Sequence, residues 1–314
     1  MGVQKVFVHE RTWGVAMTDY LELKAYGKIN LGLDVVRKRE DGYHEVRMVM
    51  QTVNLYDKIT MERTAEPGIR TETNLPYVPD GEGNLAYRAA KLLADEFDIK
   101  DGVTIKIKKY IPVAAGMAGG STDAAAVLVG MNRIFRLGLS RKELMNRGVK
   151  LGADIPYCIM RGTALSEGIG EILTELPPAP QCHVVLAKPQ VSVSTKAVYG
   201  KLRANELTAD QHPDIDGMVD AIKAEDLDGV VARLGNVLET VTVPDHPEIA
   251  KIKQIMMENG AEGALMSGSG PTVFGIYKDE EAARQTCEIL KQADGGRLTR
   301  QVYLTRFFNK KPAR

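Results

Sequence analysis

An α+β fold in two domains is predicted for this chain, and three features of the sequence support that class. The chain has 314 residues, a length that suggests two domains of roughly 150 residues each. Segments with the alternation of a strand and segments with the spacing of a helix occur in both halves. A proline-rich break, Leu176-Pro-Pro-Ala-Pro180, lies between them. We therefore expect one domain over 17–178 and a second, an α/β sandwich, over 179–310.

The first sixteen residues are expected to lie outside both domains. They lack the long apolar run of a secretory signal, and the pattern of a folded domain starts only after Met17. We interpret residues 1–16 as an N-terminal extension that packs poorly, with an upstream start codon as its simplest origin.

The first half contains several strands and three helices. Alternating apolar and polar residues predict strands over 20–36 (two strands around a turn at Tyr26–Gly27), 46–55, 58–63 and 102–111. The spacing of apolar and small residues predicts helices over 84–97, from Ser121 to near Gly138 and, behind a Ser140 cap, over 141–152.

The second half contains more helices than strands. Apolar runs and alternation predict strands over 182–189, 262–266, 272–277 and 300–307. Helices are predicted over 195–203, 215–224, 226–239, 246–259 and 279–293. The chain should therefore end in a β-α-β arrangement.

The composition excludes several classes of partner. The 41 basic residues balance the 41 acidic ones, so the formal net charge is zero. Such a chain has no general attraction to nucleic acid or to an anionic membrane surface. No apolar run reaches the roughly 18 residues that span a bilayer. We expect neither nucleic acid nor a membrane as a partner.

Cysteine and histidine usage points to a reducing compartment. Cys158, Cys182 and Cys287 are widely spaced and form no C-x-x-C pair. The five histidines show no metal-ligand spacing. We therefore expect a cytoplasmic protein without a disulfide framework or a zinc site.

The segment Pro112–Ala125 reads P-V-A-A-G-M-A-G-G-S-T-D-A-A and is the most informative in the chain. Its glycines and alanines leave little side-chain bulk, and Ser121, Thr122 and Asp123 are residues that cap helices. A glycine-rich loop that leads into a helix N-terminus can bind a phosphate. The same composition also suits a tight turn that only allows close packing. No Walker-type loop and no G-x-G-x-x-G motif occur.

Asp154 lies in Gly152-Ala-Asp-Ile-Pro156, just past a predicted helix. Pro156 is expected to force Ile155 into an extended conformation and so to fix the direction of the Asp154 side chain. Asp154 is then either a turn residue or a general base beside a phosphoryl donor.

Lys28 and Asn30 lie two residues apart on a predicted strand, so both side chains point to one face of the sheet. A lysine on an edge strand is usually only solvated. A Lys and Asn pair can also orient a hydroxyl group and stabilise an anion.

Taken together, these motifs resemble the GHMP kinase superfamily over nearly the whole chain, from about Leu21 to Phe307. Four segments carry the resemblance, namely A-Y-G-K-I-N-L (25–31), the glycine-rich segment 112–125, G-A-D-I-P-Y (152–157) and M-S-G-S-G-P-T-V-F-G (266–275). The resemblance implies the two-domain GHMP kinase fold, with an N-terminal ATP-binding domain and a C-terminal α/β domain. It also implies an active site in the cleft between them.

The resemblance also implies roles for particular residues. Asp154 and Lys28 would be catalytic, and Asn84 and Lys109 would line the adenine pocket. ATP would be bound with Mg²⁺, which Ser121 would contact. The residues implied to bind ATP are Pro112, Val113, Ala114, Ala115, Gly116, Met117, Ala118, Gly119, Gly120, Ser121 and Thr122, of which the loop 116–122 would hold the β- and γ-phosphates.

A further motif, Arg39-Glu-Asp-Gly-Tyr-His44, resembles the branch of the superfamily that binds a cytidine nucleotide. There Tyr43 and His44 would hold the cytosine, and Tyr199 would close the base from the other side. Asn30 and Thr195 would also contact the substrate. The implied reaction is ATP-dependent phosphorylation of the 2-hydroxyl of 4-diphosphocytidyl-2-C-methyl-D-erythritol in non-mevalonate isoprenoid biosynthesis. The implied assembly is a monomer or a homodimer.

The sequence departs from the superfamily pattern in two places. Met117-Ala118 stands where Leu-Gly is commoner, and Thr122-Asp123 stands where a second serine is usual. We expect the methyl group of Ala118 only to reduce backbone freedom.

Three other functions are alternatives to this interpretation. One is another GHMP kinase, of the homoserine or mevalonate type. Another is a catalytically silent ligand sensor, which should have lost Lys28 or Asp154. The third is a nucleic-acid-binding module, which the neutral charge disfavours.

Overall fold

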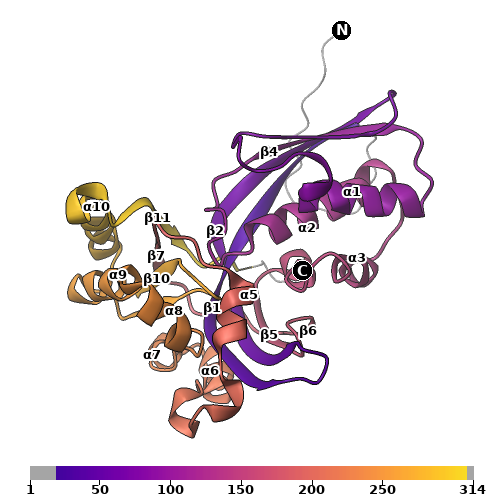
Figure 1. The fold of residues 1–314 in the computed structure, drawn as a ribbon. Helices are drawn as coiled ribbons and strands as arrows, with labels where there is room; N and C mark the ends of the chain where they lie inside the picture. The colour runs from indigo at the N-terminus through magenta and orange to yellow at the C-terminus, as the bar shows by residue number, and fades with distance from the viewer. Residues whose placement is uncertain (1–18, 310–314) are drawn as a thin grey trace.

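The computed structural model describes residues 19–309 of the chain. The expectation that residues 1–16 form a poorly packed extension lies outside the described residues. Within them the strands divide between a seven-stranded and a four-stranded sheet, and helices accompany both (Figure 1). The predicted α+β class is confirmed.

The first sheet has the spatial order β3-β4-β2-β1-β8, with β5 paired to β2 and β6 paired to β5. Its strands are β1 (Tyr20–Lys38), β2 (His44–Thr64), β3 (Ile69–Thr73), β4 (Gly102–Lys108), β5 (Thr163–Glu167), β6 (Ile172–Glu175) and β8 (Gly235–Asn236). Its helices are α1 (Leu85–Glu96), α2 (Gly119–Ile134), α3 (Arg141–Gly148) and α4 (Ile155–Met160), with a short 3₁₀ turn, η1 (Gly81–Gly83). Helices α1 and α2 pack against each other, and α2 also packs on β1 and β2 (Figure 1).

The second sheet is antiparallel throughout, in the order β11-β7-β10-β9. Its strands are β7 (His183–Pro189), β9 (Gly263–Met266), β10 (Val273–Tyr277) and β11 (Thr299–Arg306). The helices and 3₁₀ turns of this half are α5 (Thr195–Lys201), η2 (Ala204–Glu206), η3 (Ala209–Gln211), α6 (Ile215–Lys223), α7 (Leu227–Val231), α8 (Glu239–Asp245), α9 (Pro247–Glu258) and α10 (Glu280–Gly296). Helices α9 and α10 pack on its strands.

Strands β1 and β2 are each continuous, which corrects two predictions. The expected turn at Tyr26–Gly27 is an irregularity in pairing, where the register shifts between Tyr26↔Tyr56 and Lys28↔Thr52. A bulge of this kind bends a strand without ending it. The separate strands predicted over 46–55 and 58–63 are likewise parts of β2.

The helix predicted over 226–239 is wrong in its second half. Helix α7 ends at Val231, and β8 then pairs in parallel with Gly32 and Leu33 of β1. The side chain of Asn236 donates hydrogen bonds to the carbonyl oxygens of Met266 and Gly268, at 2.8 Å each. These tertiary bonds hold an extended segment where local spacing indicates a helix.

The start of α2 also differs from the prediction. The helix begins at Gly119, two residues before Ser121, and its N-cap residue Ala118 makes no side-chain capping bond. Thr122 donates instead from Oγ1 to the carbonyl oxygen of Tyr26, at 2.7 Å, and Asp123 accepts from Lys109. Thr122 and Asp123, which were expected to cap the helix, therefore attach the start of α2 to β1 and to the residue that follows β4.

Two helix starts follow their sequence signals. Asn84 caps α1 by accepting a hydrogen bond from the backbone N–H of Ala86. Ser140 and Glu143 form a reciprocal capping box at the start of α3. A polar cap followed by apolar residues at helical spacing predicts a helix well because both signals are local.

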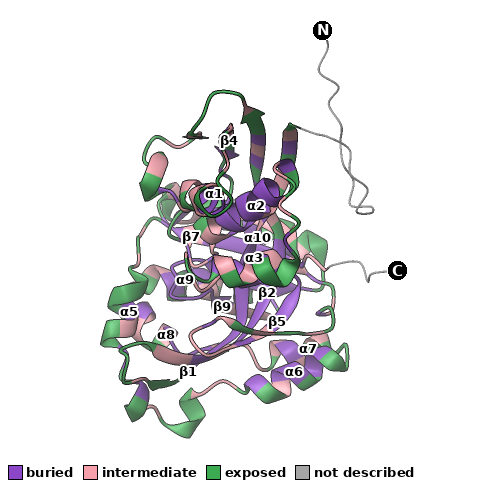
Figure 2. Cartoon of the chain, turned by 90° about the vertical axis from the view of Figure 1, so that its right-hand side faces the viewer, coloured by how far each residue is buried: buried purple, intermediate pink, exposed green. Residues whose placement is uncertain are grey.

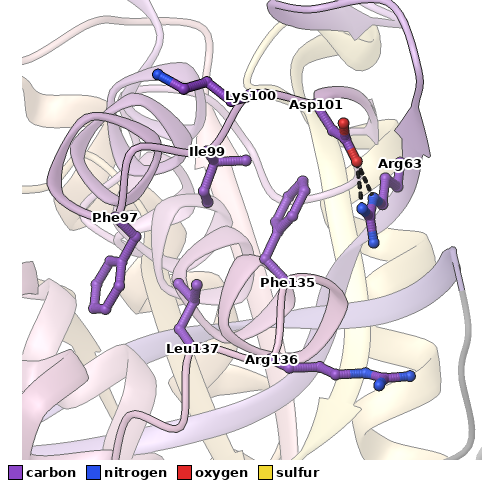
Figure 3. A pocket seen from close by; sticks show the side chains of 8 residues that line it. All are labelled: Arg63, Phe97, Ile99, Lys100, Asp101, Phe135, Arg136 and Leu137. Atoms are coloured by element: carbon purple, nitrogen blue, oxygen red, sulfur yellow. Dashed lines mark hydrogen bonds and ion pairs between the residues drawn. The ribbon is translucent and has the colours of Figure 1, made fainter.

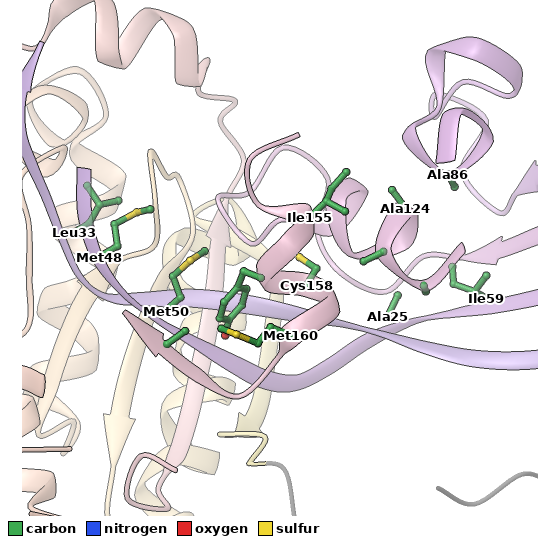
Figure 4. Close-up of a cluster of buried hydrophobic side chains, with 14 of the residues drawn as sticks. Ala25, Leu33, Met48, Met50, Ile59, Ala86, Ala124, Ile155, Cys158 and Met160 are labelled. Atoms are coloured by element: carbon green, nitrogen blue, oxygen red, sulfur yellow. The ribbon is translucent and has the colours of Figure 1, made fainter. Parts of the chain in front are cut away.

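Buried residues make up much of the strands and of α2, where helices and sheets face each other (Figure 2). One part of this core packs α4 between α2 and the first sheet, and Ile155, Cys158 and Met50 belong to it (Figure 4). Fully burying a side chain such as Ile155 stabilises the fold by about 1.5–3 kcal/mol. This packing fixes α4, whose N-cap residue is Asp154, against β1 and β2.

The two sheets are joined where the C-terminal end of the described chain contacts the middle of β2. Phe307 forms a β-bridge with Val53, and the N–H of Phe308 donates to the carbonyl oxygen of Thr52 at 2.9 Å. The domain boundary between 178 and 179 stays a prediction, and β8 of the second half completes the first sheet. None of the helices in residues 19–309 combines the length and the apolarity that crossing a membrane requires.

Candidate active site

The loop between β4 and α2 alternates in backbone conformation. Ala114, Gly116 and Ala118 have φ of 50°, 71° and 57°, so every second residue adopts the left-handed conformation. Left-handed residues between right-handed ones turn successive N–H groups toward one side, which makes an anion-binding concavity. The N-terminus of α2 follows directly and adds its free N–H groups and its dipole.

Ala118 carries more strain than its sequence suggests. Its φ of 57° costs an alanine about 1–2 kcal/mol relative to a right-handed conformation. The expectation that its methyl group only reduces backbone freedom is therefore wrong. The methyl group imposes strain at the residue that precedes α2.

The loop packs tightly against the second glycine-rich segment, residues 266–271. The hydroxyl of Ser267 donates to the carbonyl oxygen of Gly116 at 3.0 Å. A Cβ atom on Gly116 would lie 2.1 Å from the carbonyl oxygen of Ser267, and one on Gly268 would lie 3.2 Å from that of Gly116. Glycine is required at 116 both by its positive φ and by this close approach.

Lys28 and Asn30 lie directly beside this junction. The Nζ atom of Lys28 donates to Oδ1 of Asn30 at 2.7 Å, and both side chains are buried. The backbone N–H of Lys28 donates to the carbonyl oxygen of Met117 at 3.2 Å. Oδ1 of Asn30 also faces Gly268, since a Cβ on that glycine would lie 3.5 Å from it. The first motif, the loop and segment 266–271 therefore meet at one place.

Asp154 is the N-cap residue of α4, in a right-handed conformation. Ile155 is the first residue of that helix, so the expected extended conformation at Ile155 is wrong. Proline is accepted in a first helical turn because its missing N–H would have no partner there. Asp154 is half-buried.

Asp154 and Lys28 both influence the buried thiol of Cys158 in α4. Burial raises the pKa of that thiol, the charge of Asp154 raises it further, and the charge of Lys28 lowers it. Burial also raises the pKa of Tyr199, and the charge of Asp154 adds to this effect. The charge of Asp154 therefore acts on groups of both α4 and α5.

Tyr199 belongs to α5 of the second half and faces His44 of β2. Their ring centroids are 5.1 Å apart, with an angle of 50° between the ring planes. Burial and the nearby charge of Lys38 lower the pKa of His44, which favours the neutral imidazole. Tyr43 lies on the preceding turn with 60% of its surface exposed. Thr195, at the start of α5, shares a hydrogen bond of 2.8 Å with Ser269.

Asn84 and Lys109, predicted to line an adenine pocket, have their side-chain groups engaged within the protein. Asn84 caps α1 and also donates to the carbonyl oxygen of Pro79 at 3.0 Å. Lys109 points inward, and its Nζ atom donates to Asp57 at 2.5 Å and to Asp123 at 2.6 Å. Its side chain is only 5% exposed.

Comparison with known proteins agrees with this arrangement. A family model described as the GHMP kinases N terminal domain matches residues 84–162, and one described as GHMP kinases C terminal matches 218–295. A 4-diphosphocytidyl-2-C-methyl-D-erythritol kinase of Lachnoclostridium phytofermentans is 55% identical over 93% of this chain and 99% of its own length. The kinase of the same name from Lachnospira eligens is 54% identical, over 92% and 98%. This chain belongs to the 4-diphosphocytidyl-2-C-methyl-D-erythritol kinase family of the GHMP kinases.

Solved structures agree with the family. The chain superimposes on a crystal structure of 4-(cytidine 5'-diphospho)-2C-methyl-D-erythritol kinase with a TM-score of 0.78 and 30% identity, covering 92% of this chain and all of that one. A homoserine kinase from Cytophaga hutchinsonii matches with a TM-score of 0.73 and 19% identity, over 94% and 97%. The latter similarity concerns the fold alone.

Several residues that shape the site of this GHMP kinase were not predicted from the sequence. Asp57, Ser267 and Asn236 each hold a glycine-rich segment in place. Ser267 falls inside a motif already recognised as glycine-rich. Asp57 is a single acidic residue in a long strand, and no local pattern distinguishes it.

A pocket of about 470 Å³ opens elsewhere, at the C-terminal ends of α1 and α2 (Figure 3). It is lined by Arg63, Phe97, Ile99, Lys100, Asp101, Phe135, Arg136 and Leu137. Helix α2 has 16 residues and is about 24 Å long, so this pocket lies at the opposite end of α2 from the loop. None of the predicted site residues of the kinase lines it.

Within residues 19–309, no three His, Cys, Asp or Glu side chains gather closely enough to hold a metal ion. Among the described residues, a metal would therefore find fewer than three such side chains at any one place. This donor set suits a hard cation that takes most of its ligands from phosphate and water.

Proposed function

We propose that this chain transfers the γ-phosphoryl group of ATP to the 2-hydroxyl of 4-diphosphocytidyl-2-C-methyl-D-erythritol, a step of non-mevalonate isoprenoid biosynthesis. Relatives of that name at 50–55% identity support the reaction. The observation that carries the mechanism is the contact of Lys28 with the glycine-rich loop, together with the action of both Lys28 and Asp154 on the thiol of Cys158. Both charged residues are present, which disfavours the alternative of a silent sensor.

The loop is proposed to hold the β- and γ-phosphates of ATP. Its alternating left-handed residues, Ala114, Gly116 and Ala118, direct N–H groups toward one side, and the N-terminus of α2 faces the same region. Phosphoryl transfer depends mainly on such positioning and on stabilising charge. Segment 266–271 covers the loop and limits its movement.

Asp154 is proposed to accept the proton of the 2-hydroxyl as the hydroxyl oxygen forms its bond to the γ-phosphorus. The bond between that phosphorus and the oxygen bridging to the β-phosphate breaks, and ADP carries the electron pair away. Lys28 orients the hydroxyl and offsets negative charge at the phosphoryl group. Asn30 holds the Lys28 ammonium group in position at 2.7 Å.

Mg²⁺ is proposed to accompany ATP and to neutralise charge between its phosphates. Ser121, half-buried in the first turn of α2, is the residue we assign to contact it. The sparse oxygen ligands of the chain fit an ion held mainly by phosphate and water.

Tyr43, His44 and Tyr199 are proposed to bind the cytosine. The tilted pair of His44 and Tyr199 offers an aromatic wall, and the exposed ring of Tyr43 can cover the base from the solvent side. Thr195 lies at the start of the helix that carries Tyr199 and is assigned to the same substrate.

The remaining assignments concern the whole molecule. The three cysteines are free and buried, which supports a cytoplasmic location. We further propose a monomer or a homodimer, divided into domains over 17–178 and 179–310. Sedimentation of the purified protein measures its assembly.

The test is ADP release with Mg-ATP and, in turn, 4-diphosphocytidyl-2-C-methyl-D-erythritol, homoserine and mevalonate. We expect turnover with the cytidyl substrate alone. Asp154→Asn should lower kcat by about 10²–10⁴ because the general base is lost, whereas Asp98→Asn, on an exposed turn, should not. Turnover of another alcohol would refute the assigned specificity, and an active Asp154→Asn would refute the assigned base.

A further inference from the structure

The strongest charged cluster that the proposed reaction does not use lies beneath the phosphate-binding loop. Lys109 directly follows β4, the strand that enters the loop, and its ammonium group bridges Asp57 of β2 and Asp123 of α2. Asp57 is fully buried, and the side chains of Lys109 and Asp123 are 5% and 6% exposed. Three ionisable side chains therefore share one buried site.

This cluster attaches both ends of the loop to the first sheet. Oδ1 of Asp57 accepts hydrogen bonds from the backbone N–H groups of Tyr110 and Ile111, at 2.5 and 2.8 Å, where the chain enters the loop. Its other oxygen, Oδ2, accepts from Lys109. Asp123 lies in the second turn of α2, where the chain has left the loop. Lys109 is thus the link between entry and exit.

Further contacts keep the Lys109 side chain beneath the loop. The backbone N–H of Lys109 donates to Oδ1 of Asn74 at 2.7 Å, which fixes the end of the strand. A Cβ atom on Gly119 would lie 3.3 Å from the Nζ atom of Lys109 and 3.3 Å from Ile111. The first residue of α2 therefore rests directly over the ammonium group, and its lack of a side chain allows this.

Stability alone is a poor explanation for such a cluster. Taking charges out of water is costly, and apolar residues of similar volume often serve a buried site equally well. Oδ1 of Asp123 is buried without a hydrogen-bond partner among the described residues. Burial raises the pKa of Asp123 to about 8, because the attraction of Lys109 only partly opposes it and the charge of Asp57 adds to it. The cluster therefore carries an electrostatic cost at the loop.

We infer that Lys109 is a positioning residue, which sets the spacing between the two ends of the phosphate-binding loop by bridging Asp57 and Asp123. It acts on the triphosphate of ATP through the loop and makes no contact with the adenine. The inference rests on the proposed function, because it assumes that the loop binds ATP.

The test compares the binding of Mg-ATP and of inorganic triphosphate to the wild type and to Lys109→Met. Methionine keeps the length of the side chain and removes the charge. We expect the Kd of both ligands to rise by about tenfold or more, and by the same factor, since only phosphate binding depends on loop spacing. In turnover, KM for ATP should rise similarly, while KM for the cytidyl substrate stays within about twofold.

Lys108→Met is the matched control. Lys108 is the preceding residue and the last of β4, and its exposed ammonium group lies over the ring of Tyr110. It should leave both Kd values unchanged. If Lys109→Met weakens the binding of ATP but not of triphosphate, Lys109 contacts adenine. If the variant binds both ligands as the wild type does, Lys109 only stabilises the fold. Either result overturns the inference.

Asp123→Asn keeps the test valid if Lys109→Met fails to fold. It retains the shape of the site and the pair between Lys109 and Asp57, so we expect a Kd for triphosphate about threefold to tenfold above the wild type. The double variant should bind no more weakly than Lys109→Met alone, because both changes break one bridge. If the losses of binding free energy in the two single variants add up in the double variant, the inference is overturned. Wild-type protein that binds ATP without turnover would refute the proposed function and leave this comparison intact.

Discussion

The loop proposed to bind phosphate and the residues proposed to bind the base are built in opposite ways. The loop packs against segment 266–271 and is attached at both ends by Asp57 and Lys109. The base-binding residues lie on an exposed turn and on a helix of the other half, and Tyr43 is mostly exposed. Phosphoryl transfer needs atoms held at fixed separations, whereas recognition of a flat base needs only two surfaces. A change at the loop should therefore affect the fold and ATP together, and a change at the turn should affect substrate choice alone.

The strongest test of this difference is Gly116→Ala. The new Cβ would lie 2.1 Å from the carbonyl oxygen of Ser267 at a φ of 71°. We expect a loss of about 2–4 kcal/mol in the free energy of unfolding, from strain and overpacking together, and a loss of ATP binding. Urea unfolding and nucleotide titration measure the two effects.

Gly138→Ala is the control for Gly116→Ala. Its φ is 70°, and no atom lies within 4 Å of the added Cβ, so only the backbone strain remains. We expect a loss of about 1 kcal/mol and normal ATP binding. Equal losses at both glycines would show that the contact with Ser267 is unimportant.

A second test removes the exposed ring. Tyr43→Ala should raise KM for the cytidyl substrate by about 10- to 100-fold, because stacking on a base is worth about 1–3 kcal/mol. The KM for ATP and the melting temperature should not change. Tyr77→Ala removes an equally exposed ring, 68% accessible, and should leave the cytidyl KM as it is. If Tyr43→Ala lowered the melting temperature, the turn would also support the fold, and the expected difference between the two regions would be wrong.

A third test relieves strain in the loop. Ala118→Gly should stabilise the protein by about 0.5–1 kcal/mol, since glycine adopts a φ of 57° freely but costs more entropy to order. Ala94→Gly, inside α1, should destabilise it by a similar amount. In thermal unfolding, the melting temperature should rise for Ala118→Gly and fall for Ala94→Gly. Destabilisation by Ala118→Gly would mean that the methyl group makes a compensating contact.

The smallest effect is expected from pH at the base-binding residues. Burial and the charge of Lys38 lower the pKa of His44 from 6.5, so the unfolded chain takes up a proton at a higher pH than the folded one. The contribution of His44 to stability is complete above pH 6.5 and is lost as the pH falls through the lowered pKa. KM for the cytidyl substrate should rise about threefold over the same range, and His44→Asn should abolish that rise. A rise that begins above pH 6.5 would exclude His44 as its cause.

The sequence allowed the local features of the fold and the site to be predicted. Asn84 and Ser140 start helices because their signals act within one turn, and the glycine-rich segments stand out by composition. The bulge near Tyr26 looked like a turn because a strand that continues past an irregularity has no local mark. Strand β8 was missed because Asn236 is held by carbonyl groups some thirty residues further along the chain. The inward direction of Lys109 depends on Asp57, whose role only the folded sheet reveals.

The pairing of β1 with β8, together with the bridge from Val53 to Phe307, also bears on how the protein is made. A chain growing on the ribosome presents the glycine-rich loop and both catalytic residues well before Ser267 and Phe307 emerge. Until then the loop lacks its cover and the first sheet lacks a strand. A product truncated between residues 160 and 263 would contain the loop, Lys28 and Asp154 without the segment that covers the loop. Only a chain translated past residue 307 can assemble the proposed site.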